Sequence, residues 1–129
     1  MTAPTWLLKE VVLALHEQLI DEFGGATGLR DAGLLESALA RPLHLHAYTE
    51  ATMAELAASY AFGLVKNHPF LDGNKRIGFT AATTFLELNS FQFAASEVDA
   101  VVQTLALATG ELSEADFAVW LAQNASGAS

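Results

Sequence analysis

The sequence predicts an all-α protein, folded as one compact domain of about six helices over residues 1–129. Three observations predict this class. Apolar residues recur at helical spacing along most of the chain, and helix-capping residue types precede several of these stretches. Hydrophobic residues make up 52% of the chain and the mean hydropathy is +0.31, values that suit a well-filled core rather than a disordered chain. A chain of 129 residues without repeats or linkers has the size of one domain.

The first helix is expected over residues 9–23, where apolar side chains repeat every three or four residues until two consecutive glycines end the pattern. His16 falls opposite this apolar stripe and is expected at the surface. A second, short helix is expected to begin after Asp31, a good N-cap residue, and to end at Pro42, which lacks the N–H that a continuing helix uses. Residues 43–51 are expected to be irregular.

In the second half, Thr52 and Glu55 form a capping box that begins a helix, and Pro69 breaks it. Residues 75–88 are apolar on nearly every side, as expected for a central, buried helix. Residues 91–95 are expected to be extended. Ser96 and Ser113, each followed three residues later by aspartate, are expected to begin the last two helices, and the tail 123–129 is expected to fray.

Composition excludes several classes of function. Six Lys and Arg against fifteen Asp and Glu give a net charge of -9, the wrong sign for a protein that follows a phosphate backbone, so no nucleic-acid binding is expected. The absence of cysteine excludes disulfides, thiolate metal sites and cysteine nucleophiles. No apolar run reaches the roughly 18 residues of a membrane helix, and no secretory signal begins the chain. We therefore expect a cytoplasmic protein without membrane contact.

The 68–76 motif, HPFLDGNKR, contains the most unusual local feature. Lys75 and Arg76 fall in the first turn of a helix, where the helix dipole disfavours each cation by up to about 1 kcal/mol. An anionic ligand would compensate, because free N–H groups at a helix N-terminus bind anions and Gly73 allows a close backbone approach. The pattern therefore predicts a phosphate site.

Two further residues of the motif suit phosphate chemistry. Asp72 offers the hard oxygen that Mg²⁺ prefers when it also binds substrate phosphates. His68 lies four residues earlier, and histidine is the side chain that most readily exchanges a proton near neutral pH. The alternative interpretation is structural, because Asp-Gly-Asn is a common turn, Pro69 is a common helix stop and a lone histidine often only packs.

The 68–76 motif resembles the signature of the Fic/Doc family, H-P-F-x-[DE]-G-N-x-R-x-x-R. Seven specified positions match: His68, Pro69, Phe70, Asp72, Gly73, Asn74 and Arg76. Residues 23–42 are similar to the amino-terminal segment of Doc-type proteins and residues 109–121 to their closing helices, so the resemblance covers nearly the whole chain. It implies a compact helical fold that transfers part of a nucleotide to protein hydroxyl groups.

Two departures from the signature resemble the Doc branch. Lys75 stands where adenylyl-transferring Fic enzymes usually have glycine, and Phe79 stands where they have a second arginine that holds the terminal phosphate. The resemblance then implies a Doc-type toxin that transfers the γ-phosphate of ATP to elongation factor Tu and so arrests translation. One alternative is an adenylyl or other nucleotidyl transferase. Another is a catalytically silent family member that only binds its antitoxin.

The resemblance assigns roles residue by residue. His68 would accept the proton of the attacking hydroxyl, Asp72 would hold Mg²⁺, Gly73 and Asn74 would shape the anion hole, and Lys75 and Arg76 would clamp the phosphates of ATP. Pro69 and Phe70 are expected to anchor the motif in the core. Control is expected from a separate antitoxin whose disordered segment folds on binding. The sequence leaves open the modified residue and the oligomeric state.

Two histidines outside the motif, His44 and His46, alternate as metal ligands on a strand could. No third ligand adjoins them, and a place at the edge of the substrate site is an equal alternative. Arg41 is expected either to reach a phosphate or to be a solvated helix end.

Overall fold

The computed structural model describes residues 3–127 and confirms the all-α class. Within that range it has six helices, α1 (Lys9–Phe23), α2 (Ala32–Tyr48), α3 (Met53–Asn67), α4 (Asn74–Leu88), α5 (Glu97–Thr109) and α6 (Glu114–Gln123), and two short strands, β1 (Phe91–Phe93) and β2 (Ala125–Gly127). None of the helices described is long and apolar enough to cross a membrane.

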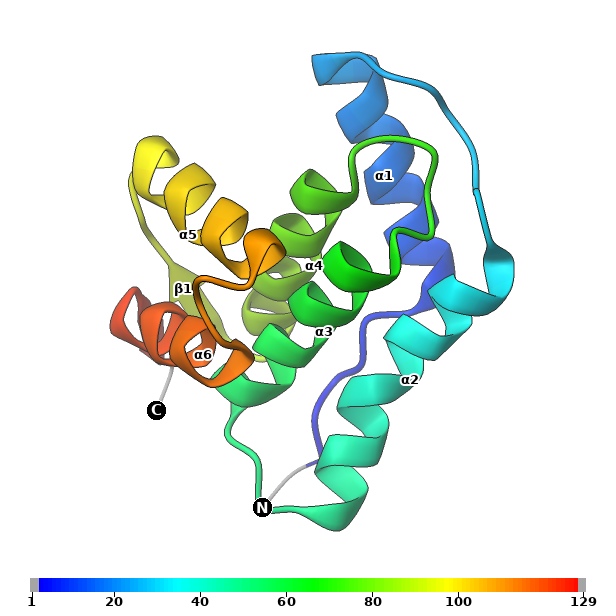
Figure 1. Ribbon diagram of the computed structural model, residues 1–129. Helices are drawn as coiled ribbons and strands as arrows, with labels where there is room; N and C mark the ends of the chain where they lie inside the picture. The colour runs from blue at the N-terminus through cyan, green and yellow to red at the C-terminus, as the bar shows by residue number, and fades with distance from the viewer. Residues whose placement is uncertain (1–2, 128–129) are drawn as a thin grey trace.

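Helices α3 and α4 occupy the centre of the molecule (Figure 1). α2 packs on α3 from one side and α6 packs on it from the other, while α1 and α5 both contact α4. The largest fully buried side chains include Tyr60 and Leu64 of α3 and Ile77 and Phe85 of α4, so the core lies between these two helices and their neighbours. The predicted central, buried helix is confirmed for residues 77–86, whereas Lys75, Arg76, Glu87 and Leu88 at its ends are exposed.

Four helices begin as their capping residues predict. The side chains of Asp31, Thr52, Ser96 and Ser113 each accept a hydrogen bond from the backbone N–H three residues further on, and Glu55 completes the capping box of α3. Each bond satisfies one of the N–H groups that a helix leaves without a partner in its first turn. These local signals therefore set the helix starts.

The predicted end of the second helix at Pro42 is wrong. α2 continues through Pro42 to Tyr48, so residues 43–48 are helical rather than irregular. Proline inside a helix costs about 3 kcal/mol because it removes one hydrogen bond and crowds the preceding turn. The ring of Pro42 is buried with Leu35 and Ala38 on the face of α2 that packs against α3, and this burial compensates for the lost bond.

The predicted fraying of the tail is also wrong over residues 125–127. These residues form β2, which pairs antiparallel with β1 in the register Phe91–Gly127, Gln92–Ser126 and Phe93–Ala125. The N–H of Ala94 also donates to the carbonyl of Asn124 over 2.9 Å. The extended piece predicted after α4 therefore acts as the template that orders this segment, and the rest of the tail, residues 128–129, lies outside the described range.

Arg41 fulfils neither of its two expected roles. Its guanidinium pairs with the carboxylate of Glu114 at 2.9 Å, donates to the backbone carbonyl of Ser59 and lies over the ring of Phe62. The pair joins α2 to the first turn of α6, where a carboxylate is favoured by the helix dipole. Arg41 is therefore a structural residue that ties the two outer helices to α3.

Tyr60 anchors the segment that precedes α1. Its hydroxyl accepts the N–H of Leu7 at 3.0 Å and lies 3.4 Å from the carbonyl of the same residue. Tyr60→Phe is expected to lower the free energy of unfolding by about 1–3 kcal/mol, because it leaves buried backbone groups of Leu7 without a partner. Chemical denaturation near pH 8 measures this loss, and Phe91→Tyr, a half-buried aromatic position on β1, is the control for adding or removing one hydroxyl.

The same pair predicts an alkaline dependence. Burial raises the pKa of the Tyr60 hydroxyl above its ordinary value of 10.0, against the smaller opposing effect of the hydrogen bond to Leu7. Above pH 10 the unfolded state therefore loses this proton before the folded state does, and stability falls as the pH rises. The stability difference between wild type and Tyr60→Phe should shrink as the pH rises above about 10; a constant difference would contradict this assignment.

Candidate active site

The 68–76 motif forms the connection between α3 and α4, with residues 68–73 as a loop. This 68–73 loop is held by the 25–31 segment that joins α1 to α2. Leu29 and Phe70 form an antiparallel bridge, the N–H of Leu71 donates to the carbonyl of Gly28 at 3.1 Å, and the N–H groups of Arg30 and Asp31 both donate to the carbonyl of Pro69. Segments about forty residues apart in the chain therefore fix the loop.

His68 follows the last turn of α3 in an unusual conformation. Its φ of 51° and ψ of 55° are left-handed, a conformation that costs a residue other than glycine about 1–3 kcal/mol. His68 is exposed. Such strain persists where the surroundings enforce it, and it is frequent at functional sites. A reactive role for His68 is consistent with this geometry.

The side chain of Asn74 holds the loop through hydrogen bonds to its backbone. Its Oδ1 accepts the N–H of Phe70 and its Nδ2 donates to the carbonyl of Phe70, both at 3.0 Å. Nδ2 also lies 3.4 Å from Nδ1 of His68, at the long limit of hydrogen bonding, so this contact does not fix which ring nitrogen carries the proton. Because Asn74 is buried, its side chain shapes the loop and its backbone N–H is what it can offer to an anion.

Asp72 is exposed at the turn before α4. Its Oδ2 accepts the N–H of Ala26 at 2.7 Å, while Oδ1 takes part in none of the hydrogen bonds found among residues 3–127. Gly25 must be glycine here, because its φ is 119° and a Cβ would lie 3.1 Å from Cβ of Asp72. The hydrogen bond to Oδ2 thus orients the carboxylate of Asp72 and leaves Oδ1 available to a ligand.

The predicted surface position of His16 is wrong. His16 is 3% exposed and stacks on the ring of Phe70 with a centroid distance of 3.7 Å. Its Nε2 lies 2.7 Å from the carbonyl oxygen of Asp72, and because a carbonyl only accepts, Nε2 carries the proton. The loop itself packs on the supposedly polar face of α1, which the sequence pattern of α1 could not indicate.

Two independent constraints require glycine at position 73. Its φ of 76° is left-handed, and a Cβ would lie 3.3 Å from Ile20 and 3.5 Å from Nε2 of His16. Gly73 also stands at the N-cap of α4 and offers no capping side chain. Within the described residues the first-turn N–H groups of Asn74, Lys75 and Arg76 therefore have no acceptor and point out of the helix end.

The two cations lie at this uncapped end. Lys75 and Arg76 are both exposed, and the guanidinium of Arg76 lies 4.5 Å above the ring of Phe23, at the end of α1. Such cation–π contact orients an arginine without neutralising it. Free N–H groups and two cations that form no ion pair within residues 3–127 suit a bound anion, so this end of α4 is the candidate anion site.

Phe79, at the position of the second arginine of the signature, packs among other aromatic side chains. It is half-buried in an aromatic cluster with Phe93 and Trp120, at centroid distances of 5.8 and 6.2 Å. Pro69 and Phe70 are buried, as predicted for residues that anchor the loop.

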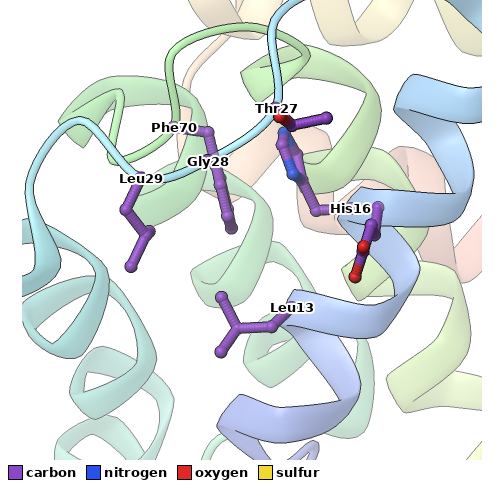
Figure 2. Close-up of a pocket in the computed structure, with 7 residues that line it drawn as sticks. Leu13, His16, Thr27, Gly28, Leu29 and Phe70 are labelled. Atoms are coloured by element: carbon purple, nitrogen blue, oxygen red, sulfur yellow. The ribbon is translucent and has the colours of Figure 1, made fainter.

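A hollow of about 260 Å³ lies behind the loop, between α1 and the segment that precedes α2 (Figure 2). It is lined by Leu13, His16, Glu17, Thr27, Gly28, Leu29 and Phe70. Phe70 alone among these belongs to the 68–76 motif, so the hollow borders the support of the loop and not the anion site.

His44 and His46 do not form the strand-like ligand pair that their spacing suggested. Both residues lie on α2, where positions two apart point in different directions, and the ring of His46 meets the edge of Trp6 at 5.5 Å. Residues 3–127 contain no group of three or more His, Cys, Asp or Glu side chains that could hold a metal ion by themselves. A place for His44 and His46 at the edge of the substrate site stays a prediction.

Two supporting residues, His16 and Arg30, were not predicted from the sequence. Both act on backbone carbonyls of the loop: His16 on Asp72, and Arg30 on Asn67 and His68. Side-chain bonds to a distant backbone leave no spacing pattern in the sequence. The sequence therefore offers no signal for either role.

The helical fold and the loop geometry define a class of protein. Residues 6–86 match the family model described as the Fic/DOC family, so the chain belongs to this family and the resemblance seen in its motif is confirmed. The chain is 36% identical over 105 residues to "Protein kinase doc" of Escherichia phage P1, a match that covers 81% of this chain and 82% of that protein. It is 43% identical over 77 residues to "Toxin Doc" of Mycolicibacterium smegmatis, over 57% of this chain and 58% of that protein. The similarity to the Doc branch is thus confirmed.

Proposed function

We propose that the protein is a Doc-type toxin that acts as a protein kinase and transfers the γ-phosphate of ATP to a protein hydroxyl. One observation carries the proposal: an exposed histidine and an exposed carboxylate flank an uncapped helix end that bears two cations. The names of the two relatives, a protein kinase and a toxin, support the same function.

In this reaction His68 accepts the proton of the attacking hydroxyl. The hydroxyl oxygen forms a bond to the γ-phosphorus, the bond from that phosphorus to the bridging oxygen breaks, and ADP leaves. The N–H groups of α4 with Lys75 and Arg76 hold the phosphates in line and balance the charge that develops on their oxygens. The protein forms little covalent chemistry of its own in this reaction, so it acts mainly by positioning the reactants.

The donor set around Asp72 fits Mg²⁺. This ion binds through one or two carboxylates together with substrate phosphates, and Asp72 presents Oδ1 beside the anion site while Ala26 fixes its Oδ2. When bound, Mg²⁺ would neutralise phosphate charge. Asp72 would then hold the ion, and ATP with Mg²⁺ is the expected substrate form.

The position of Phe79 favours γ-phosphoryl over adenylyl transfer. In the Fic signature the second arginine binds the terminal phosphate, and here that position belongs to the aromatic cluster with Phe93 and Trp120. Lys75 adds a charge at the helix end where Fic enzymes usually have glycine. An adenylyl or other nucleotidyl transferase remains the second candidate, and a silent antitoxin-binding protein the third.

We further propose elongation factor Tu as the modified protein, with arrest of translation as the result. A cognate antitoxin with a disordered segment that folds on binding is the proposed control. The test incubates the protein with elongation factor Tu, ATP and Mg²⁺ and measures the mass of the factor. A gain of about 80 Da supports phosphoryl transfer, and a gain of about 329 Da would show adenylyl transfer instead. Bound ATP with no mass gain would exclude this target.

Lys75→Ala is expected to weaken ATP binding about tenfold, equivalent to about 1.4 kcal/mol, because one charge-assisted contact to phosphate is lost. Lys66→Ala is the matched control, since Lys66 is also exposed but donates to the carbonyl of Ala108 at the end of α5. Calorimetric titration with ATP and Mg²⁺ compares the two variants. Equal effects would remove Lys75 from the phosphate site.

A further inference from the structure

Arg30 lies outside the 68–76 motif, yet its side chain makes two short hydrogen bonds where the motif begins. Nε donates to the carbonyl of His68 at 2.7 Å, and Nη2 donates to the carbonyl of Asn67 at 2.8 Å. We propose that Arg30 is the positioning residue for His68, an inference that rests on the proposed function for its kinetic consequences.

The two carbonyls belong to the two peptide groups on either side of Cα of His68. The carbonyl of Asn67 orients the peptide that defines φ of His68, and the carbonyl of His68 orients the peptide that defines ψ. The guanidinium is a rigid planar fork, so binding both oxygens fixes both peptides with respect to each other. Arg30 thereby enforces the left-handed conformation of His68, which a residue other than glycine adopts at a cost.

The backbone of Arg30 is itself held by hydrogen bonds to the loop. Its N–H and that of Asp31 both donate to the carbonyl of Pro69, at 2.7 and 3.0 Å, and Asp31 caps α2. Three consecutive carbonyls, those of residues 67–69, are therefore all bound by Arg30 and Asp31. These hydrogen bonds tie the conformation of His68 to the start of α2.

Charge explains why an arginine suits this place. The last carbonyls of α3 have no partners within the helix and carry its negative dipole, so a cation that donates to them is favoured. The ion pairs found among residues 3–127 involve Lys9 and Arg41, and Arg30 is paired with no carboxylate there. Its donors serve backbone carbonyls, whereas Lys75 and Arg76 lie at the N-terminus of α4.

The kinetic test compares Arg30→Ala and Arg30→Lys with wild type. Arg30→Ala is expected to lower kcat at least tenfold and to leave the dissociation constant of ATP within about twofold, because a displaced base slows transfer without touching the nucleotide. Lysine keeps the charge but supplies one ammonium in place of a planar fork, so only partial recovery is expected. Arg41→Ala is the control, since Arg41 also makes a two-pronged contact, to Glu114. Arg41→Ala is expected to lower thermal stability while kcat is unchanged.

A second readout does not depend on activity. In ¹³C-histidine-labelled protein, the ring signal of His68 should shift or broaden in both Arg30 variants, while those of His44 and His46, exposed on α2, stay in place. His68→Ala identifies the signal. This measurement remains valid if the proposed kinase activity proves wrong, so the two hypotheses fail separately.

The outcomes divide clearly. A fall in kcat with unchanged ATP binding and a perturbed His68 signal supports the positioning role. An unperturbed His68 signal in both variants overturns it, as does a kcat equal to that of wild type in folded Arg30→Ala. An ATP dissociation constant raised tenfold or more would show that Arg30 binds phosphate, and would also overturn it.

Discussion

His68→Ala is expected to reduce phosphoryl transfer by about 10²–10⁴-fold, the range that a positioned general base contributes. The fold should be unaffected, because His68 is exposed and the side-chain hydrogen bond that it makes within residues 3–127, with Asn74, is 3.4 Å long. Histidine is more common than alanine in a left-handed conformation, so His68→Ala is expected to lower stability slightly without changing the fold. ATP binding should persist, since the N-terminus of α4 is the element proposed to hold the phosphates.

Three measurements make this result specific. Incorporation of labelled phosphate into the target gives the rate, titration with ATP gives the affinity, and circular dichroism confirms the helical fold. His44→Ala is the matched control, as an exposed histidine on α2 outside the motif. Near-normal transfer by His68→Ala would remove the histidine from catalysis and would favour a reaction in which the phosphate acceptor needs no base.

The fold was predictable where its signals are local. Asp31, Thr52, Ser96 and Ser113 define helix starts through bonds to residues three positions away, and such bonds are visible as sequence spacing. The apolar character of residues 75–88 correctly indicated the central helix for the same reason. Capping and periodicity therefore carry most of the architecture of this chain.

Prediction failed where distant contacts override local preference. Pro42 ends helices in isolation, but here its ring is buried against α3 and the helix continues. The tail has no strand pattern of its own and is ordered because β1 offers it unpaired backbone groups. Likewise the side of α1 that carries His16 is buried by the 68–73 loop, whose position no pattern within α1 records.

The candidate site likewise has one part that the sequence predicts and one part that it does not. The residues that would face substrate were predicted because they are contiguous in the 68–76 motif, and residue type alone suggests the chemistry of a base, a carboxylate and two cations. The residues that support them, His16 and Arg30, bond to backbone oxygens 56 and 38 positions away. Their partners are chosen by the tertiary fold, so only the structure reveals them.

Gly78→Val is expected to lower the free energy of unfolding by about 3 kcal/mol, at the upper end of the usual cost of overpacking. Gly78 lies where α4 meets α3, and a Cβ there would be 2.6 Å from Cγ2 of Val65 and 3.2 Å from the carbonyl oxygen of Ala61. Neither neighbour yields easily, because valine has a stiff, branched side chain and the oxygen belongs to helix backbone. The two central helices must therefore move apart.

This displacement reaches the site, since the 68–73 loop joins the same two helices. Gly78→Val should thus lower transfer activity as well as the melting temperature, the latter by roughly 10 °C. Gly33→Val is the matched control: Gly33 is helical and exposed, and the nearest atom to its Cβ is a side-chain oxygen of Asp31 at 3.3 Å, so a change within about 1 kcal/mol is expected. Equal thermal stability of the two variants would mean that α3 and α4 accommodate a side chain at their crossing, and that the close approach of these helices is not what fixes the loop.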